Sequence, residues 1–372
     1  MPAVSRVDAF QRRHPVVGFP LAVAYKLFDD QGVYLAALIT YYGFLSLFPL
    51  LLLLASVLGF VLDDDPQLQD RILDSTLSQF PVVGEQLRDP QGLQGNGAAA
   101  VIGAVIAIYG ALGVAQALQN AMNVAWAVPR HHRPNPITAR ARSLLLLATA
   151  GLAVLATTTL SAVAGAVGAG DGDIGSPTSL AVTVAAVVVD TIIFAALFRI
   201  ATAARLSFGA VWPGALFASI VWQLLQVFGS AYVDGVVRDA GLAYGVFAIV
   251  LGLLAWIFLA ALGVIVGVEV NVVRTKRLYP RALLTPFTDN VDLTSADRRS
   301  YTDAAVAQRH KGFEQVAVTF DTRHRAGTEP STLDSPVTAG AEATSTTDVP
   351  ATESANRDID TSNPSGDGPN EK

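Results

Sequence analysis

Residues 32–62 read GVYLAALITYYGFLSLFPLLLLLASVLGFVL, and none of these side chains carries a charge. Roughly 20 apolar residues in a helix cross a hydrocarbon core about 30 Å thick, so this run is long enough to span a bilayer. It is longer than the minimum, and Pro49 removes one backbone hydrogen bond within it. We therefore expect a kinked or tilted transmembrane helix here.

The composition of the whole chain shows the same bias. Of its 372 residues, 52% are hydrophobic and only 15% are charged, with a mean hydropathy of +0.44. A soluble domain of this length would carry about 25% charged residues. The absence of cysteine excludes disulfides, thiolate metal sites and cysteine nucleophiles. The composition predicts an all-α membrane protein.

Further apolar runs of spanning length follow the first one. They cover residues 98–128, 143–169, 178–199, 208–233 and 244–273. Together with the first run, they predict a six-helix transmembrane bundle over residues 32–273.

The Lys and Arg residues that flank these runs predict the orientation. The N-terminal flank, the second loop, the fourth loop and the C-terminal exit carry 14 of them, whereas the first, third and fifth loops carry 3. Because Lys and Arg are retained on the cytoplasmic side, we expect both termini inside.

The segments outside the predicted spans differ in character. Residues 1–31 form a cytoplasmic N-terminus, with a short amphipathic helix over residues 16–30 that we expect along the inner surface. Residues 63–97 predict an interfacial or cap helix. Residues 274–326 are a basic and then mixed juxtamembrane segment, and residues 327–372 have the acidic, Ser- and Thr-rich composition of a disordered tail.

Three stretches resemble one known family. They are DDQGVYLAALITYYGFLSLFPLLLLLASVLGF, ALQNAMNVAWAV with the basic loop and RSLLLL after it, and AYGVFAIVLGLLAWIFLAALGVIVGVEVN. In order and spacing they resemble the YihY/BrkB family. That resemblance implies a six-helix bundle in a bacterial inner membrane, a role in virulence or serum resistance that describes a phenotype, and proposals of transport or lipid handling. The family also carries an older label, ribonuclease BN, which we do not expect to describe the activity.

Polar residues inside the predicted spans are the candidates for a substrate or proton path. Gln116, Gln119, Asn120 and Asn123 share one helical face, which either lines a hydrophilic path or cross-links helices. Asp190 lies halfway along its span. It is either a protonation switch or a structural acid bonded to Gln223 or to the amides.

Glu269 and the paired tyrosines each have two interpretations, and a glycine pair has one. Glu269 lies near the end of the last span. It either belongs to the substrate or proton path or pairs with a nearby arginine or amide. Tyr41 and Tyr42 supply hydroxyl groups to the interior or anchor the helix at the membrane surface. Gly263 and Gly267 form a small-xxx-small pair, which predicts close helix packing.

These features favour a transporter or flippase-like protein for a lipid or amphipathic solute, with a membrane scaffold for envelope assembly as the alternative. An enzyme is not expected, because the adjacent His131 and His132 do not converge on one ion and no carboxylate accompanies them. The chain has no Walker-type loop, so ATP bound to this chain is not expected to drive any pumping. No cofactor or metal is expected. The expected partners are membrane lipids and, through the tail, envelope proteins, but not nucleic acid. The oligomeric state stays open.

Overall fold

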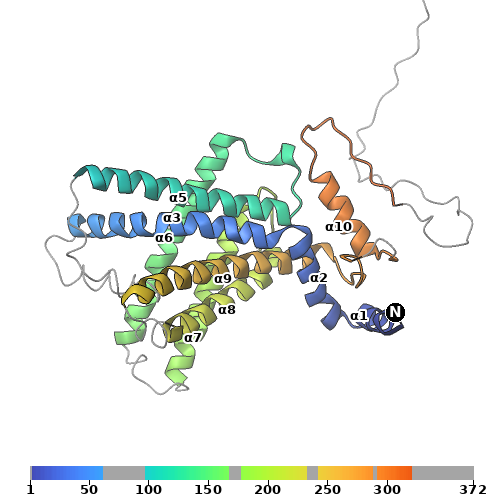
Figure 1. Ribbon diagram of the computed structural model, residues 1–372, viewed down its shortest axis with the longest axis horizontal. Helices are drawn as coiled ribbons and strands as arrows, with labels where there is room; N and C mark the ends of the chain where they lie inside the picture. The colour runs from blue at the N-terminus through green and yellow to red at the C-terminus, as the bar shows by residue number, and fades with distance from the viewer. Residues whose placement is uncertain (1, 62–96, 167–176, 233–241, 288–290, 321–372) are drawn as a thin grey trace, which may run out of the picture.

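The computed structural model describes residues 2–61, 97–166, 177–232, 242–287 and 291–320, and their regular structure is entirely helical. Figure 1 shows the arrangement. The helices are α1 (Pro2–Arg13), α2 (Pro15–Asp29), α3 (Gly32–Val61), α5 (Gly97–Ala125), η3 (Arg130–His132), α6 (Pro136–Ala166), α7 (Pro177–Ala201), α8 (Phe208–Tyr232), α9 (Leu242–Lys276) and α10 (Ser295–Val306).

The long helices confirm a multi-pass membrane architecture. Those long and apolar enough to cross a membrane, among the described residues, contain the segments Val105–Ala125, Pro136–Thr157, Leu180–Ala201, Phe208–Gly229 and Val250–Lys276. The first predicted span coincides with α3, whose apolar described part is the shorter segment Gly32–Leu47. The count of six spans stays a prediction. The predicted cap helix at 63–97 and the tail at 327–372 lie outside the described residues.

The bundle is built from neighbouring antiparallel helices. Helix α3 packs along α5 and α9, while α7 packs along α8, α8 along α9, and α6 along α7. Figure 1 shows α3 and α5 side by side, with α1, α2 and α10 gathered at one end of the bundle. We call this end, where the loops between α5 and α6 and between α7 and α8 also lie, the basic end.

Small residues set the closest helix crossings. A Cβ atom on Gly214 of α8 would overlap the carbonyl oxygen of Gly267 in α9, and one on Gly263 would lie 2.6 Å from Val221. The predicted close packing at Gly263 and Gly267 is therefore confirmed. Since apolar side chains gain nothing by leaving lipid for protein, such backbone contact supplies the packing energy of the bundle.

Asparagine and arginine side chains of α9 also bond the start of α8. Pro213 lacks an N–H, so the carbonyl of Gly209 loses its usual donor within the helix. Arg274 donates to this carbonyl at 3.1 Å, and Asn271 bonds both the Gly214 N–H (2.7 Å) and the Val211 carbonyl (2.9 Å). The start of α8 is thereby joined to α9 at the point where Pro213 interrupts the hydrogen bonds within α8.

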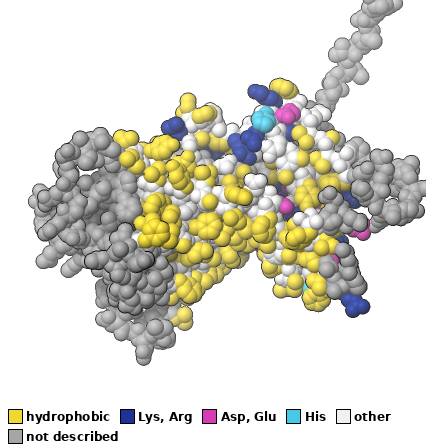
Figure 2. Space-filling model, in the orientation of Figure 1, with side chains coloured by type: hydrophobic (Ala, Val, Ile, Leu, Met, Phe, Trp, Pro, Cys, Tyr) yellow, Lys and Arg dark blue, Asp and Glu magenta, His cyan; other side chains and the backbone are white. Residues whose placement is uncertain are grey.

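The surface of the bundle is apolar where lipid would contact it. Figure 2 shows hydrophobic side chains over the middle of the molecule. Helices α6 and α7 are the least buried of the long helices. Leu152 of α6 and Ile192 of α7 are both more than half exposed. In lipid, these side chains face a solvent as apolar as themselves.

Candidate functional site

A cavity of about 300 Å³ lies where α3, α5, α7, α8 and α9 meet. Its lining is wholly apolar and includes Ile39, Leu118, Phe198, Trp222, Trp256 and Val264. Protein interiors hold few voids larger than a water molecule. Cavities lined this way stay dry and accept apolar ligands. The cavity is therefore suited to the hydrocarbon part of a ligand and not to an ion.

Asp190 and Gln223 form a polar pair beside this cavity. Asp190 is buried in α7, one turn before Phe194, which lines the cavity. The side-chain amide of Gln223 donates to its carboxylate at 2.7 Å, and Trp222, the neighbour of Gln223 in α8, also lines the cavity. Gln223 was one of the partners expected for Asp190, and the structure brings the two together.

The amide stripe of α5 does not line the cavity. Gln119 is buried and donates to Ser143 Oγ (2.9 Å) and to the Ala139 carbonyl (3.2 Å), which joins α5 to α6. Asn123 is buried and accepts from the backbone N–H of Ala203 at 2.9 Å, which fixes the loop between α7 and α8. These two amides cross-link the bundle.

The other two amides of the stripe are exposed. Gln116 faces outward, and Asn120 accepts from Arg133 at 3.4 Å. The predicted stripe is therefore split: Gln119 and Asn123 lie in the core, and Gln116 and Asn120 lie at the surface.

The paired tyrosines of α3 also separate. Tyr41 is 60% exposed, whereas Tyr42 is half-buried and packs edge-to-face against Tyr109 of α5, with a ring-centroid distance of 6.4 Å. A Cβ atom on Gly113 would overlap the Tyr42 ring, so a glycine of α5 makes room for it. Tyr42 therefore belongs to the α3–α5 contact.

Glu269 lies in a buried cluster of charges at the basic end. Its side chain is fully buried, and neither carboxylate oxygen has a hydrogen-bond donor among the described residues. The nearest cation is Lys26 of α2, whose Nζ lies 3.9 Å from Glu269 Oε2. The sequence suggested an arginine or amide partner from the same end of the last span. The partner is instead a lysine from a different helix.

Lys26 holds this cluster together. Its Nζ donates to Asp30 Oδ2 and, at 3.2 Å, to the Ala125 carbonyl of α5. Burial disfavours the ammonium, but the carboxylates of Glu269 and Asp30 outweigh burial and raise the pKa of Lys26. Burial raises the pKa of Asp30, an effect that Lys26 opposes. Two carboxylates thus share one ammonium in a site with little access to water.

The sequence predicted a short amphipathic helix over residues 16–30 along the inner surface, and it did not predict the burial of Lys26. Helix α2 does expose Val17 and Phe28, as an interfacial helix would, but Lys26 is only 4% exposed and faces α9 and α5. The signal that was available is the pair of opposite charges at Lys26 and Asp30, four residues apart and directly before a charge-free run.

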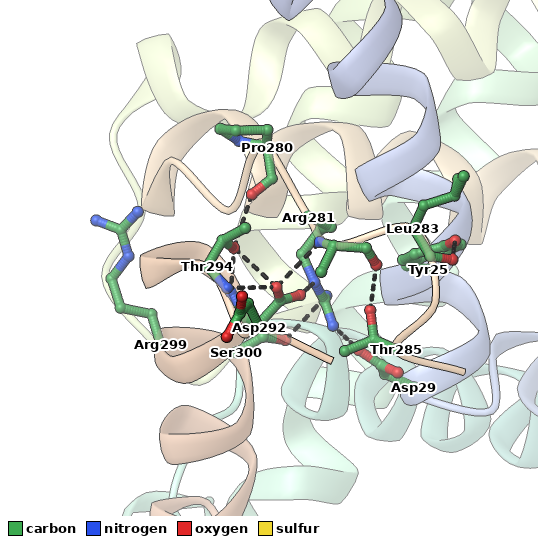
Figure 3. A network of polar contacts seen from close by, with 12 residues as sticks. Tyr25, Asp29, Pro280, Arg281, Leu283, Thr285, Asp292, Thr294, Arg299 and Ser300 are labelled. Atoms are coloured by element: carbon green, nitrogen blue, oxygen red, sulfur yellow. Dashed lines mark hydrogen bonds and ion pairs between the residues drawn. The ribbon is translucent and has the colours of Figure 1, made fainter. Parts of the chain in front are cut away.

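A second buried network fixes the segment after α9 against α2, as Figure 3 shows. Arg281 is buried and bonds Asp297, Asp29 (2.9 Å) and Ser300 (3.4 Å). The hydroxyl of Tyr25 donates to the Leu283 carbonyl beside it. Because these groups use their bonding capacity on one another, we interpret the network as structural.

Helix α10, within the segment predicted as mixed juxtamembrane sequence, begins with a capping box. Thr294 Oγ1 accepts from the Asp297 N–H (3.1 Å), and Asp297 accepts from the Thr294 N–H (2.9 Å). Such a reciprocal pair is a recognised start of a helix, so the sequence TSAD at 294–297 held a signal that hydropathy does not report.

Comparison with known protein families shows which family the chain belongs to. The profile of the family described as "Virulence factor BrkB" matches residues 23–289, well over half of the chain. The chain belongs to the BrkB family. Its matched region contains the cavity and Asp190, together with all three members of the Lys26 cluster.

A curated relative is known by a different name. The chain is 26% identical over 264 residues to the "Putative ribonuclease-like protein YfkH" of Bacillus subtilis (strain 168). The alignment covers 68% of this chain and 93% of that protein. No solved structure matches the chain. The match to BrkB thus shows that the chain belongs to a family of membrane proteins, but it does not supply a mechanism.

Proposed function

We propose that this BrkB-family protein transports a lipid or another amphipathic solute across the bacterial plasma membrane. The proposal includes six transmembrane helices with both termini in the cytoplasm, and no catalytic reaction. The observation that carries it is the apolar cavity of about 300 Å³ at the junction of five helices. An apolar hollow of this size between five helices leaves room for the hydrocarbon part of a ligand.

The charges near the cavity support transport of an amphipathic molecule. Asp190 and Gln223 lie beside the lining on α7 and α8. Ionisable groups inside a membrane are costly and are retained mainly where they serve a path or a switch. An apolar centre with polar groups at its edge fits a molecule with a hydrocarbon part and a headgroup.

RNA cleavage, which the printed name of the Bacillus subtilis relative suggests for that protein, fits this site less well. Cleavage of RNA takes place in water at phosphate groups, whereas the candidate acids of this chain, Asp190 and Glu269, are buried between helices. We therefore propose transport and not nuclease activity for this BrkB protein.

The test is lipid translocation in proteoliposomes that hold the purified full chain, with headgroup-labelled fluorescent phospholipids and an impermeant quencher. Ala260 lines the cavity, and Ala255 on the same helix is exposed to lipid. A cavity of about 150 Å³ accepts a benzene ring, so the ring of Ala260→Phe would fill a large share of this one. The same change at Ala255 is the matched control.

We expect the wild type and Ala255→Phe to accelerate translocation, and Ala260→Phe to slow it severalfold. Val264→Phe serves as a second cavity-filling variant, with gel filtration to show that each variant is folded. Wild-type rates equal to those of empty vesicles for every lipid tried would refute lipid transport. Equal rates for all variants would show that the cavity is not the route.

A further inference from the structure

A second, larger hollow lies at the basic end, between α6, α7 and the loop that joins α7 to α8. Its volume is about 600 Å³, and three arginines from three different segments line it: Arg142 of α6, Arg199 of α7 and Arg205 of the loop. The other lining residues are Leu145, Ala196, Ile200, Thr202, Ala203, Ala204 and Leu206, so the hollow contains no carboxylate.

The three guanidinium groups have nitrogen atoms left for a ligand. Arg142 Nη1 donates to the Thr202 carbonyl at 3.5 Å, and Arg199 Nε donates to the Leu206 carbonyl at 3.2 Å. Neither arginine, nor Arg205, forms an ion pair with a carboxylate of the described residues. Three positive charges therefore face one space, and no carboxylate of the described residues pairs with them there.

The loop that carries Arg205 is fixed before any ligand binds. Asn123 of α5 accepts from the Ala203 N–H, and Thr202 Oγ1 donates to the Phe198 carbonyl at 2.7 Å. The bonds from Arg142 and Arg199 join both ends of the same loop to α6 and α7. A site fixed in this way loses little conformational entropy on binding.

The position of the hollow indicates an amphipathic ligand. Arg142 lies near the start of the apolar segment Pro136–Thr157, and Arg199 near the end of Leu180–Ala201. Leu144 and Leu145, two and three residues after Arg142 on α6, are more than half exposed. A phosphate in the hollow would thus have its acyl chains beside exposed leucines.

We propose that this hollow is a binding site for an anionic phospholipid, and that it prefers diphosphatidylglycerol, whose two phosphates can pair with three guanidinium groups. Guanidinium groups bind phosphate oxygens in a bidentate manner, and basic pockets between transmembrane helices suit headgroups of this kind. The proposal does not depend on transport, since a scaffold would hold the lipid equally well.

The experiment measures lipid binding to the purified full chain in a neutral detergent. Native mass spectrometry gives apparent affinities for diphosphatidylglycerol, phosphatidylglycerol and phosphatidylethanolamine. The test variants are Arg142→Gln, Arg199→Gln and Arg205→Gln. The matched control is Arg140→Gln, an exposed arginine on α6 that does not line the hollow.

We expect diphosphatidylglycerol to bind most tightly, and each test variant to weaken it about fivefold, the effect of one basic side chain near a charged membrane surface. Arg140→Gln should leave the affinity unchanged, and excess inorganic phosphate should not displace the lipid. Equal affinity for the three lipids, or the same loss in Arg140→Gln, would overturn the proposal by showing general attraction to basic residues. Displacement by inorganic phosphate would overturn it in favour of a free-anion site.

Discussion

Replacing Lys26 with methionine should destabilise the protein more than any other lysine substitution. The methionine keeps the length and apolar stem of the side chain but removes the ammonium that Asp30 and Glu269 share. Removing one member of a buried ion pair typically costs about 3–5 kcal/mol, because a charge is left uncompensated. We expect a loss in this range.

The assay is reversible unfolding in mixed micelles with increasing dodecyl sulfate, followed by the fluorescence of the chain's four tryptophans. Lys311→Met is the matched control: Lys311 is exposed, and its loss should change the unfolding free energy by no more than about 0.5 kcal/mol. The double variant Lys26→Met/Glu269→Gln should recover part of the loss, because one of the two orphaned charges is gone. If Lys26→Met is as stable as Lys311→Met, the buried cluster does not exist as described.

The pH dependence of the same variant has a definite sign. Burial raises the pKa of Asp30 above its usual 3.8, and Lys26 opposes that increase. A carboxyl group with a raised pKa stays protonated to a higher pH in the folded state than in the unfolded state. Its contribution to stability therefore falls as the pH rises through the folded pKa. Without Lys26 the pKa of Asp30 rises further. The deficit of Lys26→Met should therefore shrink as the pH is lowered towards 3.8 and grow towards neutrality, and a deficit independent of pH would contradict the assignment.

Three other substitutions test the packing. Asn271→Leu removes the bonds to the Gly214 N–H and the Val211 carbonyl, and should lower the unfolding free energy by about 1–3 kcal/mol in the same micelle assay. Gly214→Ala forces a Cβ onto the Gly267 carbonyl and should cost about 1–3 kcal/mol, whereas Gly151→Ala, with no atom within 4 Å of its new methyl, should be neutral or slightly stabilising. Arg281→Met removes the cation between Asp29 and Asp297, so limited proteolysis should cleave residues 282–294 faster than in the wild type, and an unchanged rate would show that the network does not fix this segment.

Hydropathy and charge counting predicted the helical membrane architecture because these signals are local. An apolar run of 20 or more residues has few alternatives to a transmembrane helix, and five predicted spans coincide with long apolar helices in the structure. Helix α6 starts at Pro136, before the predicted start at Ser143, because Asn135 caps it: its Oδ1 accepts from the Thr138 N–H at 2.8 Å. Hydropathy does not detect a cap.

The partners of the candidate residues were only partly predictable. Gln223 was one of two partners considered for Asp190, since facing helices at similar depth limit the choice. The partner of Glu269 was missed, because Lys26 precedes it by more than 200 residues and lies on a helix that sequence reasoning placed at the surface. The sequence showed that the amides share one face of a helix. It does not show which helix or loop packs against each of these amides.

Photolabelling with a phospholipid that carries a diazirine at the end of its acyl chain tests most directly whether the central cavity holds the hydrocarbon part of the transported molecule. Labelled peptides of α9 would be mapped by mass spectrometry. We predict label on the lining residues Trp256 and Val264 as well as on the exposed Leu259, and its loss from the lining residues alone in Ala260→Phe. Label confined to exposed residues such as Leu259 would show that lipid chains do not enter the cavity and would contradict the proposed route.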